Sequence, residues 1–133
     1  MTREELKYYK ALQLVFKEKM GEWELGDRGW FYGEVIYVTG DTITNPDLFR
    51  FDGNIIEEPI RLPLPIDPEN PERGLWGMVK DLVGVDRFSE GIWQIVVCGQ
   101  LDTKEWFYDG ETITLALLKA LAHQEGITVW NIL

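Results

Sequence analysis

The sequence of 133 residues contains little of the chemistry on which enzymes most often depend. Cys98 is the one cysteine, so no disulfide can form within the chain. With His123, the one histidine, it makes too small a set for the common zinc sites. Ser89, the one serine, lacks the glycine-flanked setting of a hydrolase nucleophile. No glycine-rich phosphate loop is present either, and we therefore predict no metal, no cofactor and no catalytic residue.

Long apolar runs are lacking as well. No stretch approaches the roughly 18 consecutive apolar residues that cross a membrane. The segment Thr2–Leu6 is acidic and amphipathic, unlike the apolar core of a signal peptide. The sequence therefore predicts a cytoplasmic protein without membrane contact.

Positive charge is scarce. The chain has 13 Lys and Arg against 23 Asp and Glu, a formal net charge of −10. Such a field repels phosphate backbones and argues against direct nucleic-acid binding, which needs Lys and Arg to displace counterions. It favours basic partners. It would also suit an acidic mimic of DNA that inhibits a DNA-binding enzyme, provided that the carboxylates line a duplex-like stripe.

What the chain does have is enough apolar material for one folded domain over residues 1–133. Hydrophobic residues make up 45% of it, and a domain of this length can build a core without disulfides. Helical periodicity and capping residues predict three helices. They cover Thr2–Met20, Asn70 to Gly84, and Ile113 to Gly126, the last one apolar on almost every side, with Leu117, Leu118 and Leu121 buried.

β-Branched and aromatic runs bounded by turn residues predict the strands. Together with the helices they indicate an α+β fold with a mostly antiparallel sheet, packed against N-terminal, middle and C-terminal helices. We expect strands at Trp30–Val38, Leu48–Phe51, Asn54–Arg61, Ile92–Cys98 and Leu101–Tyr108 (the last at an edge), and turns at Asp41–Pro46, Asp52–Gly53 and Asp109–Thr112. The segment Val129–Leu133 either adds a short final strand or covers the core.

The candidates for catalysis are weak on sequence grounds. His123 lies near the exposed end of the last predicted helix. No acidic or basic residue stands at a spacing that would indicate a hydrogen-bond partner for its imidazole. We interpret it as a solvated helix-end histidine. The central loops are rich in carboxylates, and Asp47, Asp52, Asn54 and Glu57 could supply some oxygen ligands to a hard cation. A small metal-dependent hydrolase therefore stays open as an alternative, although the spacing of known calcium loops is absent.

Aromatic residues are the most suggestive set, with six Trp, five Tyr and six Phe. Tyr and Trp are common at protein interfaces because they combine a large rigid area with one polar group. Alternate strand residues point to opposite faces, so some of these rings must point away from a single core. We predict a homodimer, or contact with another protein, through Trp30, Tyr32, Trp106 or Tyr108, aided by unpaired edge strands.

The second half of the chain also resembles a known group of proteins. Arg61-Leu62-Pro63, a short helix over Leu75–Leu82, a strand pair and the run Asp109–Leu121 follow one another in this order. This layout is similar to that of small uncharacterised proteins encoded by phages and prophages of Gram-positive bacteria. The resemblance implies a phage-derived cytoplasmic setting. That family has no assigned activity, so no functional residue follows from it.

Overall fold

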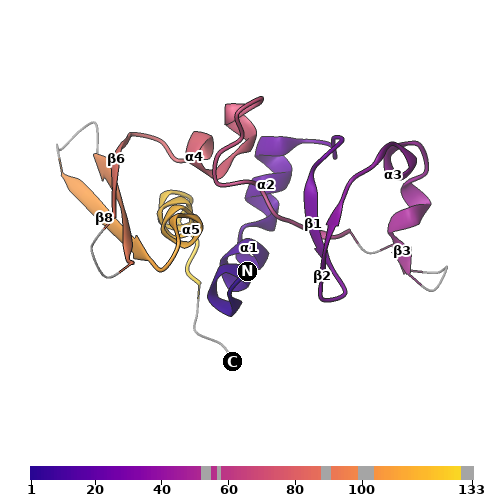
Figure 1. Ribbon diagram of the computed structural model, residues 1–133, viewed down its shortest axis with the longest axis horizontal. Coiled ribbons are helices and arrows are strands. Elements are labelled where there is room, and N and C mark those ends of the chain that lie inside the picture. The colour runs from indigo at the N-terminus through magenta and orange to yellow at the C-terminus, as the bar shows by residue number, and fades with distance from the viewer. Residues whose placement is uncertain (52–54, 57, 88–90, 99–103, 130–133) are drawn as a thin grey trace.

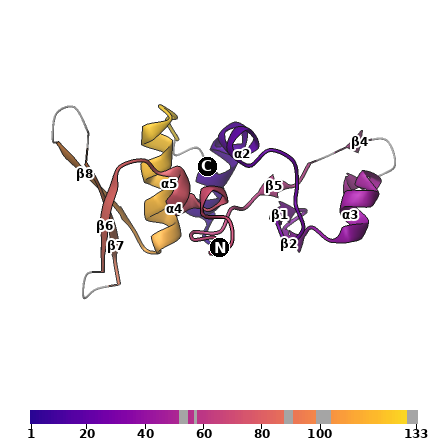
Figure 2. The same ribbon diagram turned by 90° about the horizontal axis from the view of Figure 1, so that it is seen from above.

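The structure, a computed structural model, describes residues 1–51, 55–56, 58–87, 91–98 and 104–129. Helices from both ends of the chain lie in the middle of the molecule, and a three-stranded antiparallel sheet lies on either side of them (Figures 1 and 2). This arrangement confirms the predicted α+β class. The strands are divided between two such sheets and a separate two-stranded pair.

The N-terminal helix is confirmed as two segments in line, α1 (Arg3–Ala11) and α2 (Gln13–Met20). Thr2 caps α1, because its hydroxyl accepts from the N–H of Glu5 at 3.1 Å. Leu12 separates the two segments, yet its N–H still bonds Tyr8 and its carbonyl accepts from Phe16, both at 3.0 Å. The apolar face therefore continues through the junction into the core.

The first sheet has the order β2-β1-β5, and here the sequence prediction was wrong. The run expected to be one strand is a hairpin, because Tyr32 and Gly33 both have positive φ (48° and 79°) and form a two-residue turn. Such turns usually carry Asn or Asp beside Gly, so the tyrosine concealed this one. The strands are β1 (Arg28–Phe31), β2 (Glu34–Tyr37) and β5 (Ile60–Arg61).

The next segment forms short helices where a turn and a strand were expected. Thr39 and Thr42 make a capping box that begins α3 (Gly40–Thr44), so the predicted turn is helical. The 3-10 helix η1 (Pro46–Phe49) takes up the first half of the predicted strand. Strand β3 (Arg50–Phe51) then pairs with β4 (Ile55–Ile56), and the predicted turn at Asp52–Gly53 lies outside the described residues.

The middle helix is shorter than predicted. After the proline-rich connector come η2 (Pro71–Arg73) and α4 (Leu75–Met78), and the chain then turns at Asp81, whose φ is 57°. The residues that seemed to extend the helix belong to strand β6 (Leu82–Arg87). The prediction was wrong because the apolar residues from Leu75 to Val83 are spaced three or four apart, as in a helix. The β-branched residues Val83 and Val85 instead favour a strand.

The second sheet has the order β6-β7-β8. The apolar run predicted as a strand is the central β7 (Trp93–Cys98), with Ile95 fully buried. The edge position of β8 (Glu105–Gly110) is confirmed, although this strand continues two residues into the predicted turn. Residues 101–103, the start of the prediction, lie outside the described part of the chain.

Helix α5 (Ile113–Gln124) is the centre of the core, as predicted. Leu117, Leu118 and Leu121 are all fully buried. The helix packs against β7 and β8 on one side and against α1 and α4 on the other, which explains why it has no wide polar face. Of the two alternatives for the C-terminal segment, Val129 agrees with the second, since it packs against the core and is not in a strand, and residues 130–133 lie outside the described residues.

Candidate functional sites

The four aromatic residues predicted to form a contact surface lie at two separate places. Trp30 and Tyr32 belong to the β1–β2 hairpin, whereas Trp106 and Tyr108 belong to β8. Figure 1 shows these elements on opposite sides of the central helices. Each pair lines a hollow of its own, so they cannot form one contact patch within a single chain.

The hairpin hollow, of about 270 Å³, lies beside the tip of the β1–β2 hairpin. Trp30 is half-buried and packs against the core, while Tyr32 is 54% exposed. The ring of Tyr32 meets that of Phe31 edge to face, with 4.6 Å between centroids. A bulky residue in the left-handed region is an uncommon feature of a turn. The hollow is lined by Lys10, Trp30, Phe31, Tyr32, Gly33, Glu58 and Ile60.

The histidine hollow, of about 290 Å³, lies between β8 and the end of α5. His123 is exposed, as predicted, but it has a partner that the sequence did not reveal. Its Nδ1 is hydrogen-bonded to the hydroxyl of Tyr108, and its ring lies 4.7 Å from that of Trp106 between centroids. The antiparallel packing of α5 on β8 creates this contact, and no short spacing in the sequence indicates it. The lining residues are Val79, Lys80, Asp81, Val97, Trp106, Tyr108, Ala120, His123 and Gln124.

The polar groups that meet in the histidine hollow are an imidazole and a phenol. Burial raises the pKa of Tyr108, so its phenol stays protonated at neutral pH. The partner of His123 in the described structure is thus a neutral hydroxyl, whereas an activated histidine is usually oriented by a carboxylate. The hollow offers an aromatic wall with a polar edge.

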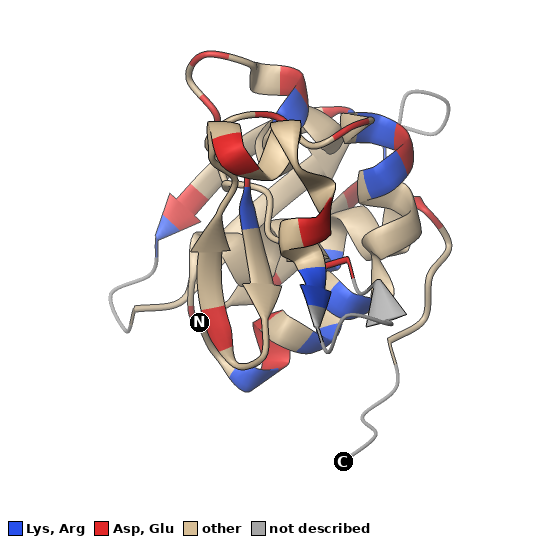
Figure 3. Ribbon diagram, turned by 90° about the vertical axis from the view of Figure 1, so that its right-hand side faces the viewer, with Lys and Arg blue, Asp and Glu red and all other residues tan. Residues whose placement is uncertain are grey.

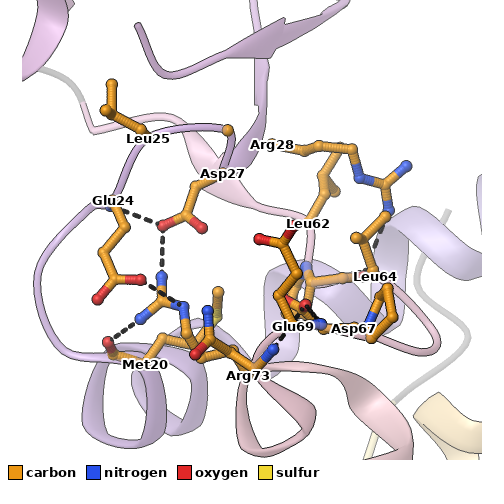
Figure 4. A pocket seen from close by; sticks show the side chains of 14 residues that line it. Met20, Glu24, Leu25, Asp27, Arg28, Leu62, Leu64, Asp67, Glu69 and Arg73 are labelled. Atoms are coloured by element: carbon orange, nitrogen blue, oxygen red, sulfur yellow. Dashed lines mark hydrogen bonds and ion pairs between the residues drawn. The ribbon is translucent and has the colours of Figure 1, made fainter. Parts of the chain in front are cut away.

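The third hollow, of about 270 Å³, is organised by Arg73 (Figure 4). This arginine is buried, and its guanidinium bonds three groups from one segment of the chain. It donates to the carbonyl of Met20, pairs with Glu24 at 3.2 Å, and pairs with Asp27 at 2.5 Å. Asp27 also accepts from the N–H of Glu24 at 2.9 Å. Arg73 therefore ties η2 to the loop between α2 and β1, which is a structural role.

The fourth hollow, of about 340 Å³, is lined by Arg61 and Trp23, and we call it the Arg61 hollow. Arg61 is 4% exposed, and its guanidinium stacks over the ring of Trp23 at 4.6 Å. Gln13 holds its backbone, because the amide of Gln13 accepts from the N–H of Arg61 at 2.7 Å and donates to its carbonyl at 3.1 Å. Burial lowers the pKa of Arg61, while the charges of Glu58 and Asp27 act in the opposite direction.

Sequence reasoning missed Arg61 and Arg73 as buried groups. Arg61 ends a predicted strand and Arg73 lies in the first turn of a predicted helix, and neither pattern shows that an arginine there is buried. Arginine is almost never fully buried unless it is paired, so exposure is the default expectation for it. The packing of β5 and η2 against α2 brings these two residues inside.

The loop carboxylates do not gather into a metal site in the part of the chain that the structure describes. No group of three or more His, Cys, Asp or Glu residues is suitably placed there. Asp47 is engaged by Arg50 at 3.0 Å, and Asp52, Asn54 and Glu57 fall outside the described residues. On the side drawn in Figure 3, Lys and Arg lie among the Asp and Glu residues, unlike the stripe that a DNA mimic would need.

Two further findings bear on the class of protein. Within the described residues, no helix is both long and apolar enough to cross a membrane. Comparisons with models of protein families, with curated proteins and with solved structures found no match. The resemblance to phage-encoded proteins therefore stays a prediction.

Proposed function

We propose that this protein is a non-catalytic binding protein that acts through contacts with other protein chains, and that two copies associate through strand β8. The position of β8 supports the second part. It is an edge strand with three consecutive aromatic residues, of which Trp106 is 38% exposed and Phe107 55% exposed. An edge strand presents backbone groups that a second strand can pair with.

A twofold axis through Phe107, perpendicular to the sheet, gives a specific arrangement. Antiparallel pairing about that axis sets Phe107 opposite its own copy on the outer face of the sheet. On the inner face it sets Trp106 opposite the partner subunit's Tyr108. Each side chain then points to the same face of the sheet in both copies, as the alternation of side chains along a strand requires. The register therefore uses two of the four aromatic residues that the sequence singled out.

The hairpin is the second contact surface in this proposal. Tyr32 stands at its tip with a strained backbone and an exposed ring. Strain of this kind is commonly found where a side chain must be held for binding. The net charge of −10 favours a partner with a basic surface. The setting that we propose is the cytoplasm of a bacterium that carries a prophage.

Sedimentation equilibrium at micromolar concentration tests the association. We expect the wild-type mass to be that of a dimer and the Phe107→Asp variant to be a monomer, because two carboxylates would meet at the axis. Phe107 is exposed in the single chain, so this substitution leaves the core intact. The matched control is Leu14→Asp on α2, where the side chain is 82% exposed, and it should stay dimeric. A monomeric wild type would contradict the proposal.

A further inference from the structure

Two N–H groups beside the Arg61 hollow have no acceptor in the described part of the molecule. They are the indole Nε1 of Trp23 and the guanidinium Nη1 of Arg61, and both atoms are buried. A buried donor without a partner destabilises the folded protein, and more so when it is charged. Native proteins seldom leave such groups unless a ligand, an ion or a water completes them. Trp23 and Arg61, the residues that carry these donors, both line the Arg61 hollow.

The chemistry of these groups restricts what can complete them. Indole and guanidinium can only donate, and so can the ammonium of Lys17, which also lines the hollow. The missing group must therefore be an acceptor, and an ionised oxygen acceptor makes the stronger hydrogen bond to a guanidinium. We propose that the Arg61 hollow binds a carboxylate group, whose oxygens accept from Arg61, Trp23 and Lys17. This inference is independent of the dimer proposed above.

The remaining charges favour a carboxylate over a phosphate. Glu22 and Glu58 also line the hollow, so its two positive and two negative side chains balance. A singly charged carboxylate adds less repulsion than a phosphate with two charges. Arginine also presents a planar fork of donors that matches the two oxygens of a carboxylate.

The backbone of Arg61 is fixed before any ligand arrives, because Gln13 holds it from the side opposite β1. The guanidinium stacks on Trp23, and the unpaired donor atoms of both residues are buried. In the proposed complex, these two side chains shift together until Nη1 and Nε1 reach the ligand. A volume of about 340 Å³ leaves room for a group of two oxygens and its attachment.

A titration of the ¹⁵N-labelled protein tests this site, with the indole Nε1–H of Trp23 as the reporter. The probe is sodium acetate, and acetamide is its matched neutral control because it has nearly the same shape. Sodium chloride keeps the ionic strength constant, and sodium phosphate tests the choice of anion. We expect a saturable shift with acetate, none with acetamide, and weaker binding of phosphate than of acetate. The titration is then repeated with N-acetylglycine and with a peptide that contains glutamate. This comparison distinguishes a small free carboxylic acid from a carboxylate on a protein chain as the ligand.

Variants connect the signal to the arginine. Arg61→Lys should weaken acetate binding by about tenfold or more, because a charge-assisted hydrogen bond is lost. Arg50→Lys, at an exposed position on β3, should bind as the wild type does. If Arg61→Lys does not fold, Lys17→Gln replaces it, with the amide of Gly21 as a second reporter, and a weaker affinity is again required. Three results would overturn the proposal. They are a shift that acetamide also produces, a shift that does not saturate with acetate, and an acetate affinity that is unchanged in the variant.

Discussion

Arg73 shows how a single charged side chain can determine the path of a loop. Its side chain is 8% exposed, and that of its partner Asp27 is 12% exposed. Moving two such charges out of water costs several kcal/mol each, and the attraction between them repays this only if both remain. Removal of one partner therefore leaves an uncompensated charge inside.

We predict that Arg73→Met lowers the free energy of unfolding by about 3 to 5 kcal/mol, measured by urea denaturation. The matched control is Arg50→Met, which removes the pair with Asp47 at the surface, where both side chains are well exposed. Surface pairs contribute about 0 to 1 kcal/mol, so this control should unfold almost as the wild type does. If both variants lose the same free energy of unfolding, Arg73 does not hold η2 to the loop between α2 and β1.

Tyr9 gives a prediction that depends on pH. Its hydroxyl donates to the carbonyl of Pro63 at 3.2 Å, and burial raises its pKa from 10.0 to about 12. The pKa of Tyr9 is higher in the folded state than in the unfolded state. The protonated phenol therefore contributes its full stabilisation of the fold below pH 10, and this contribution is lost as the pH rises toward 12. A difference of this size corresponds to roughly 2 to 3 kcal/mol.

Tyr9→Phe isolates that effect. At pH 8 the variant should be less stable by about 1 kcal/mol, because the hydrogen bond to Pro63 is missing. Above pH 10 the gap should close and then reverse, since phenylalanine cannot ionise. Urea denaturation at a series of pH values measures both. A gap that stays constant up to pH 12 would contradict a raised pKa at Tyr9.

At the scale of elements, Gly77 shows where helix propensity misleads. A glycine inside a helix costs about 1 kcal/mol relative to alanine, so helix propensity alone would favour alanine in α4. The structure shows why glycine stands there. A Cβ at Gly77 would collide with the carbonyl oxygen of Pro71 and lie 2.6 Å from its carbonyl carbon. Glycine is needed because η2 folds back against α4 at this point.

We predict that Gly77→Ala destabilises the protein by about 1 to 3 kcal/mol, since backbone atoms must move to admit the methyl group. The control is Gly40→Ala in α3, where nothing lies within 4 Å and φ is not positive. That variant should be neutral or up to about 1 kcal/mol more stable. Thermal unfolding of the two variants compares them, and a stabilised Gly77→Ala would refute the close approach of η2 to α4.

The sequence predicted the elements whose pattern is long and local. The first and last helices follow from apolar periodicity with threonine caps at Thr2 and Thr112, and β7 follows from an apolar run that only Gln94 interrupts. The errors fall where a single residue decides the path. Tyr32 turns a strand into a hairpin through a positive φ that is uncommon for a tyrosine. The middle helix ends at Met78, and the chain turns at Asp81 before β6.

The sites could be predicted less well than the elements, for a related physical reason. A helix depends on neighbours three or four residues apart, whereas Arg61 meets Gln13 across 48 positions and Arg73 meets Asp27 across 46. Aromatic abundance drew attention to Trp106 and Tyr108 as contact residues, which stays a prediction, whereas their contact with His123 depends on how α5 packs on β8. Such contacts exist only in the folded molecule.

At the scale of the whole molecule, the net charge of −10 must oppose any association of two copies. In the register centred on Phe107, Glu105 of one chain also lies opposite the partner subunit's Asp109. Like charges directly opposed across two strands destabilise the pair. The aromatic contacts must outweigh both effects, so the strength of the dimer should depend on how well salt screens these charges.

We therefore predict that added sodium chloride strengthens the dimer, because the screening length falls from about 30 Å at 0.01 M to about 10 Å at 0.1 M. Asp109→Asn should strengthen it further at low salt, where it removes the direct repulsion from Glu105 and keeps an oxygen to accept from Gln94. Asp47→Asn is the matched control, because it makes the same change in net charge at an exposed site on η1, far along the chain from β8. Sedimentation equilibrium over a salt series compares the three proteins. If salt dissociates the dimer, or if Asp47→Asn strengthens it as much as Asp109→Asn does, then β8 does not form the interface in this register.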